Sequence, residues 1–298
     1  MISPVTSPPP GVDLCEDSSW NPIIAAGNWV PVTGGIAGFI FAGLMFLLST
    51  RPARQREAAR GFTMLLTAFF GFISLTFVTV AISGERVCAR AHTSHAIIGG
   101  ILALSLVSMC AGLSWIIVAF TRFGQEALSF ACHLIHAAQV LSAVMLVVSS
   151  TGYVRLITED FGFGGVELAM VSVTAVFVLA GVALGVAVRR RPLSEKAQGR
   201  FVSVLAGGTL AYLAVASVSV GVFLSTPSRH WVHTATWVVQ SVAWGGLVSP
   251  LLILLVSIGA VAGRMPGEKP AGSAQPGKAA APRPREEGSP GAAAREAS

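Results

Sequence analysis

The stretch "SHAIIGGILALSLVSMCAGLSWIIVAF", residues 94–120, contains no Asp, Glu, Lys or Arg. It is longer than the roughly 20 apolar residues that an α-helix needs to cross the hydrocarbon core of a bilayer. Because such runs are continuous and do not alternate with polar residues, they predict helices and not the strands of a barrel. Seven such runs occur, none with Asp, Glu, Lys or Arg in its interior, at residues 32–49, 62–82, 94–120, 128–149, 166–188, 201–224 and 233–262. The sequence therefore predicts an all-α integral membrane bundle of seven transmembrane helices.

The composition agrees with this prediction. The chain has 298 residues, of which 53% are hydrophobic and 11% are charged, whereas soluble domains carry about 25% charged residues. Its mean hydropathy is +0.71. The opening "MISPVTSPPP" has neither the basic segment nor the apolar segment of a cleavable signal peptide, so we expect none.

Positive charge is distributed unevenly between the loops. Sixteen of the 20 Lys and Arg residues fall in the first, third and fifth loops and in the C-terminal tail, and four fall elsewhere. Since cytoplasmic loops carry the excess of Lys and Arg, we expect the N-terminus outside and the C-terminus inside the cell. The basic residues are typical of contacts with the lipid bilayer, and no nucleic-acid-binding module accompanies them.

The predicted spans divide the chain into three regions. Residues 1–30 form an expected extracellular N-terminal arm, residues 31–262 the transmembrane domain, and residues 263–298 a cytoplasmic tail. The tail has no large apolar residue after Met265 and is rich in Pro, Gly and Ala, which predicts disorder. The abundance of Ala, Gly, Val and Arg over Lys points to a GC-rich bacterial genome, and hence to a bacterial plasma membrane.

An internal repeat links the two halves of the chain. "RPARQREAARGF" before the second span resembles "RRPLSEKAQGRF" before the sixth, and each is followed after a similar distance by a His-x-x-His pair. Two parallel triplets of helices need one extra crossing between them, so seven spans fit a 3+1+3 parallel pseudo-repeat. Chance similarity between two Arg-rich loops is the alternative.

The four histidines of these pairs form the main candidate site. "RAHTSH" (residues 90–95) contains His92 and His95, and "SRHWVH" (residues 228–233) contains His230 and His233. Residues three apart share a helix face, so the repeat predicts an outward-facing cluster at one depth on spans three and seven. Such a cluster would suit Zn²⁺ or Cu²⁺, and one imidazole from each span would suit a haem. A pH switch and interfacial histidines without a ligand are the alternatives.

Four carboxylates lie in the loops on the same side and could orient the imidazole N–H groups. They are Glu85, Glu159, Asp160 and Glu167.

A further polar group lies inside the fourth span, in "CHLIHAAQ". His133, His136 and Gln139 are intramembrane polar residues, which are functional candidates by default. They could form hydrogen bonds between helices or line a cavity. Gln240 in the seventh span is a possible partner, as are three serines of the third span, Ser105, Ser108 and Ser114.

The four cysteines separate by predicted location. Cys15 and Cys88 both fall on the oxidising outer side, which predicts a disulfide between them, with two unpaired thiols as the alternative. Cys110 and Cys132 lie within spans and are expected to pack as small core residues.

The layout of seven spans and a three-one-three repeat resembles those of the microbial rhodopsins and the SWEET sugar transporters. A retinal Schiff base needs a Lys in the seventh span, but the chain has only Lys196, Lys269 and Lys278, in a loop and the tail, so retinal is excluded. The predicted spans contain only one proline, Pro250, and therefore lack the proline quartet of SWEET proteins.

Three functional hypotheses follow. The first is a non-enzymatic membrane protein that binds a metal or a partner through the outward-facing histidines. The second is a facilitative transporter of a small neutral solute, since Ser, Thr and Gln can line a polar path. The third is a haem or metal redox protein. Ion pumping is not favoured, because no carboxylate lies in the interior of a predicted span.

Overall fold

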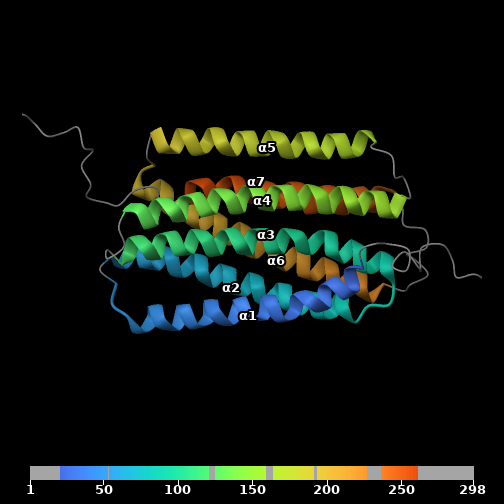
Figure 1. The fold of residues 1–298 in the computed structure, drawn as a ribbon, viewed down its shortest axis with the longest axis horizontal. Helices are drawn as coiled ribbons and strands as arrows, with labels where there is room; N and C mark the ends of the chain where they lie inside the picture. The colour runs from blue at the N-terminus through green and yellow to red at the C-terminus, as the bar shows by residue number, and fades with distance from the viewer. Residues whose placement is uncertain are drawn as a thin grey trace, which may run out of the picture. The chain divides into compact units, whose positions relative to one another are not determined.

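The computed structural model describes residues 21–52, 54–120, 125–158, 164–190, 193–226 and 236–260. No strand occurs among these residues, and each of the seven helices is long and apolar enough to cross a membrane. The helices, shown in Figure 1, are α1 (Pro22–Ser49), α2 (Gln55–Ser83), α3 (Cys88–Ala119), α4 (Gln125–Thr158), α5 (Gly165–Arg190), α6 (Glu195–Ser225) and α7 (Thr236–Ala260). The prediction of an all-α, seven-helix membrane bundle is confirmed.

Helix α1 begins earlier than predicted. The predicted span starts at residue 32, but α1 starts at Pro22 and so includes residues 22–30 of the predicted N-terminal arm. Asn21 caps this helix, because its side-chain oxygen accepts hydrogen bonds from the N–H groups of Ile23 (2.9 Å) and Ile24 (3.3 Å). Proline suits the first helical position, where its missing N–H would have no partner. Residues 1–20 and 261–298, including the whole of the predicted tail, lie outside the described residues.

Consecutive helices run in opposite directions, so the bundle has two ends. We call the end at which α1 ends and α2 begins the basic end, because it carries Arg51, Arg56 and Arg60. It lies on the left in Figure 1. The other end, where α2 ends and α3 begins, is the opposite end. The charge distribution predicts that the basic end faces the cytoplasm.

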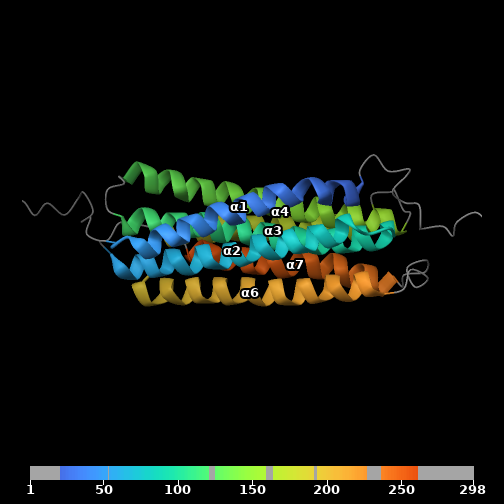
Figure 2. The same ribbon diagram turned by 90° about the horizontal axis from the view of Figure 1, so that it is seen from below.

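Helix α3 lies in the middle of the bundle. It contacts α1, α2, α4, α6 and α7, and it lies between other helices in both Figure 1 and Figure 2. Close approach depends on small residues, as is typical of helices in lipid. Gly100 lies against Tyr212 of α6, whose hydroxyl donates a hydrogen bond to the carbonyl of Ile97 at 3.1 Å. Gly246 of α7 lies so close that a Cβ there would be 3.2 Å from the Ala96 carbonyl oxygen.

Polar contacts join four helices at the basic end. The Arg60 guanidinium of α2 lies 4.7 Å from the centre of the Trp115 ring of α3 and donates to the Glu195 carbonyl of α6 at 2.9 Å. The Trp115 indole N–H donates to the carbonyl of Ala260, the last residue of α7, at 2.7 Å. The bond from Trp115 gives the Ala260 carbonyl, at the end of α7, a hydrogen-bond partner that its own helix does not provide.

The two triplets of the predicted repeat do not pack alike. Within the first triplet, α1 packs mainly against α2, the helix that follows it. Within the second, α5 packs against α7 and against the linker α4. Similar loops therefore lead into different helix arrangements, and the structure does not confirm the repeat.

Candidate functional site

The histidine pair of the third span lines one cavity. His92 and His95 lie one turn apart near the start of α3, and His92 is only 3% exposed. The cavity has a volume of about 390 Å³ and lies between α3 and α4. Its remaining lining residues are Ala96, Met145, Val148, Ser149, Gly152 and Tyr153. We call this cavity the histidine cleft.

The α4 wall of the histidine cleft combines small and polar residues. Tyr153 is buried, and its hydroxyl is 3.2 Å from Thr93 Oγ1, which donates in turn to the Ala89 carbonyl at 2.8 Å. Nothing lies within 4 Å of the Cβ position at Gly152. The missing side chain of Gly152 therefore leaves room opposite the imidazoles, while the bond between Tyr153 and Thr93 fixes the two walls relative to each other.

A buried ion pair positions the start of α3. Arg90 Nη2 lies 2.6 Å from Glu85 Oε1, and these side chains are 14% and 7% exposed. Arg90 Nη1 also donates to the carbonyls of Leu224 (3.1 Å) and Thr226 (2.6 Å) at the end of α6. A cation at this position also complements the negative end of the α6 dipole. The sequence analysis missed this role, since an Arg and a Glu five residues apart carry no specific signal.

Two of the carboxylates that the sequence suggests as hydrogen-bond partners of the histidines, Glu85 and Glu167, bind arginines and backbone N–H groups. Glu85 accepts from Arg90 and from two backbone N–H groups, those of Arg86 and Val87. Glu167 accepts from the Gly164 N–H at 2.9 Å and lies 3.7 Å from Arg155 Nε. These two carboxylates hold the ends of helices. The other two candidates, Glu159 and Asp160, lie outside the described residues.

The second histidine pair precedes α7. The described part of α7 begins at Thr236, so His230 and His233 lie outside the described residues and their place near His92 and His95 remains a prediction. Gly246 lies beside Ala96, and the α7 residue at the level of His92 is therefore close to Val242. Among the described residues, no three His, Cys, Asp or Glu side chains are grouped so that they could hold a metal ion.

Cys88, the first residue of α3, is disulfide-bonded. The predicted partner, Cys15, lies outside the described residues, so the pairing remains a prediction. Cys110 is free and buried, as expected for a small core residue. The side chain of Cys132 lies outside the described residues.

The polar residues of the fourth span separate into different environments. His133 is exposed, and its Nδ1 lies 2.7 Å from the Ser129 carbonyl oxygen of its own helix. Gln139 Nε2 donates to Ser257 Oγ of α7 at 2.5 Å, and Ser257 donates in turn to the Leu254 carbonyl at 2.6 Å. Gln139 therefore makes a hydrogen bond between helices, but to a serine that the sequence analysis missed.

Gln240, Ser105 and Ser114, which the sequence suggests as partners of the polar residues of α4, lie elsewhere or bond within their own helix. Gln240 is exposed on α7. Ser105 and Ser114 donate to carbonyls within α3, at 2.6 Å and 2.7 Å. Both serines therefore bond within their own helix, and the hydrogen bond of Gln139 to another helix goes to Ser257 of α7.

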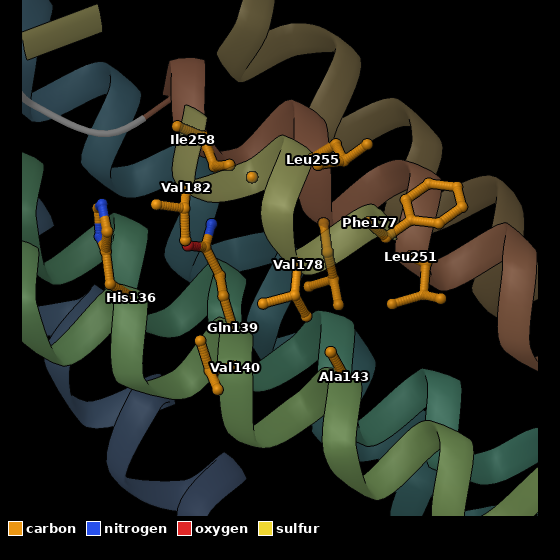
Figure 3. A pocket seen from close by; sticks show the side chains of 12 residues that line it. His136, Gln139, Val140, Ala143, Phe177, Val178, Val182, Leu251, Leu255 and Ile258 are labelled. Atoms are coloured by element: carbon orange, nitrogen blue, oxygen red, sulfur yellow. The ribbon is translucent and has the colours of Figure 1, made fainter. Parts of the chain in front are cut away.

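A second cavity, of about 100 Å³, lies where α4, α5 and α7 meet (Figure 3). We call it the inner cleft. His136 and Gln139 line it from α4, and His136 Nε2 lies 3.4 Å from the Cβ position at Gly185 of α5. Its other lining residues are apolar: Val140, Ala143, Phe177, Val178, Gly181, Val182, Leu251, Leu254, Leu255 and Ile258.

No family model matches this chain, and the comparisons with curated proteins and with solved structures find no similar protein.

Proposed function

We propose that this chain is a bacterial plasma-membrane protein that binds a transition-metal ion, Zn²⁺ or Cu²⁺, at its outer end through His92 and His95. The observation that carries the proposal is the shared cavity: two imidazoles one turn apart line the histidine cleft together with the Ser149 and Tyr153 side chains. The role is binding, and we assign no reaction to the protein.

The chemistry of the cleft suits such an ion. Neutral imidazole is a good ligand for both Zn²⁺ and Cu²⁺. Two histidines leave coordination positions for water or for further side chains, and a structural zinc site has four ligands. In this proposal water supplies the remaining positions, because the α7 residue level with His92 is close to Val242 and not to His233. The Arg90–Glu85 pair supports the site indirectly, because it holds the turn of α3 that precedes His92.

The other two hypotheses have less support. A facilitator with a central path would need space along the bundle axis, where α3 lies with most of its side chains buried. A haem held between α3 and α7 would need an axial ligand from α7 level with His92 or His95, but the α7 residue level with His92 is close to Val242. A visible spectrum of the purified protein tests the haem hypothesis, since a bound haem gives a Soret band.

Metal titration of the purified full-length protein tests the proposal. We expect His92→Ala with His95→Ala to weaken Zn²⁺ or Cu²⁺ binding by about a hundredfold, roughly 2.7 kcal/mol. His133→Ala is the matched control, because His133 is exposed and lies outside the cleft. His230→Ala with His233→Ala tests the second pair separately. Unchanged binding by a folded His92/His95 double variant would rule the site out.

A further inference from the structure

The polarity of the inner cleft is ordered along the bundle axis. His136, Val182 and Ile258 line its part nearer the basic end, whereas Ala143, Phe177 and Leu251 line the part nearer the middle of the helices. Figure 3 shows His136 and Gln139 toward one end of the cavity and Phe177, Leu251 and Ala143 toward the other. From His136 to Ala143 the cleft extends about 10 Å along α4 at 1.5 Å per residue. One end is therefore polar and the deeper end apolar.

The helix that closes the inner cleft is weakly packed. Only 6% of the most apolar window of α5 is buried, the lowest share of any candidate span in the described chain. Val182 lines the cleft and is nevertheless 56% exposed. The cleft is thus accessible from the bilayer beside α5, and a molecule dissolved in the membrane can reach it without crossing water.

A basic residue lies at the level where a lipid headgroup would be. Arg190, the last residue of α5, is exposed and lies five residues beyond Gly185, or about 7.5 Å closer to the basic end. Gly185 itself packs against the His136 ring. Positive charge at this depth attracts the anionic headgroups of the cytoplasmic leaflet.

We propose that the inner cleft binds an anionic phospholipid of the cytoplasmic leaflet. A short segment of one acyl chain occupies the apolar part between Phe177 and Leu251, and the rest of that chain lies in the bilayer along the exposed face of α5. The glycerol ester region lies beside Gln139, and the headgroup phosphate lies near Arg190. Gln139 donates one amide hydrogen to Ser257, so its second amide hydrogen remains to donate to an ester carbonyl oxygen. The lipid fills the space that α5 leaves against α4 and α7.

Photolabelling in vesicles tests this proposal. Full-length protein is reconstituted into phosphatidylethanolamine vesicles that contain phosphatidylglycerol with a diazirine on one acyl chain, and the adducts are mapped by mass spectrometry. We expect adducts on residues 136–143, 177–182 and 251–258. Val178→Trp fills the cleft and lowers this labelling about tenfold. Val176→Trp is the matched control, since Val176 is 64% exposed on the same helix.

Two further results separate the parts of the proposal. Replacing the probe with a phosphatidylcholine analogue lowers cleft labelling, and Arg190→Gln removes this difference between the two lipids. Equal labelling by both lipids in the unmodified protein would overturn the headgroup assignment. Adducts spread evenly over the exposed faces of α5, or equal labelling of the Val178→Trp and Val176→Trp variants, would overturn the site. If Val178→Trp does not fold, the adduct map of the unmodified protein decides.

Discussion

Helices α3 and α5 are the two most hydropathic spans of the described chain, but their surroundings are opposite. In α3, 67% of the most apolar window is buried by other helices, and in α5 only 6% is. The interior of α3 carries small or polar residues such as Gly100, Ser105 and Ser108, whereas α5 exposes Leu179. In lipid, apolar side chains gain little from leaving the solvent, so small residues and polar groups decide which helix lies inside.

The first test of this comparison concerns the ion pair at the start of each helix. Removing one partner of a buried pair leaves an uncompensated charge and typically costs about 3–5 kcal/mol. We therefore expect Arg90→Gln to lower the free energy of unfolding by about that amount, because both Arg90 and Glu85 are largely buried. The measurement is the unfolding midpoint of the purified protein in detergent.

The matched change at α5 is Arg155→Gln. Arg155 lies 3.7 Å from Glu167, and the two side chains are 36% and 5% exposed. Solvent screens the Arg155 charge, and the Gly164 N–H still donates to the buried Glu167 carboxylate, so the expected loss is smaller than at Arg90, about 1–2 kcal/mol. Equal losses from Arg90→Gln and Arg155→Gln would show that α3 is not held more tightly than α5 at this end.

The second test places the same added volume in each helix. Ala111 of α3 is fully buried among Met64, Trp115 and Leu205, whereas Ala175 of α5 is exposed. Overpacking a well-packed interior typically costs about 1–3 kcal/mol. We expect this loss for Ala111→Leu and a change within about 0.5 kcal/mol for Ala175→Leu. Thermal unfolding of both variants in the same detergent compares them directly, and a destabilised Ala175→Leu variant would mean that α5 has neighbours on its exposed face.

The sequence predicts the number and type of the helices but not their neighbours. The absence of charged residues from residues 94–120 and the Arg-rich loops suffice to locate seven spans, because a bilayer excludes charge. Hydropathy alone does not distinguish the buried helix α3 from the exposed helix α5, because both are strongly apolar. It also misses the bond between Trp115 and Ala260, since the partner is a backbone carbonyl that any residue would provide.

The candidate site was predicted in part. The spacing of His92 and His95 predicts a shared helix face, and both line one cavity. The repeat, however, directs attention to span seven, whereas the opposite wall of the histidine cleft comes from α4, through Ser149, Gly152 and Tyr153. Which helix faces a given side chain depends on interhelical packing, and no local pattern in the sequence encodes it.

The third and smallest test adds one methyl group to each helix. At Gly100 a Cβ would meet the Tyr212 ring and hydroxyl, so Gly100→Ala displaces the hydrogen bond from Tyr212 to the Ile97 carbonyl. Losing that bond costs about 0.5–1.5 kcal/mol, which predicts a fall of roughly 1–6 °C in the unfolding midpoint. At Gly181 of α5 a Cβ would lie 3.3 Å from Ile258 Cδ1, the flexible end of a side chain that can turn aside. Since alanine also favours helix more than glycine does, by up to about 1 kcal/mol, Gly181→Ala is expected to be neutral or stabilising. Unfolding midpoints that fall equally for the two variants would mean that α5 packs as closely against α7 as α3 packs against α6.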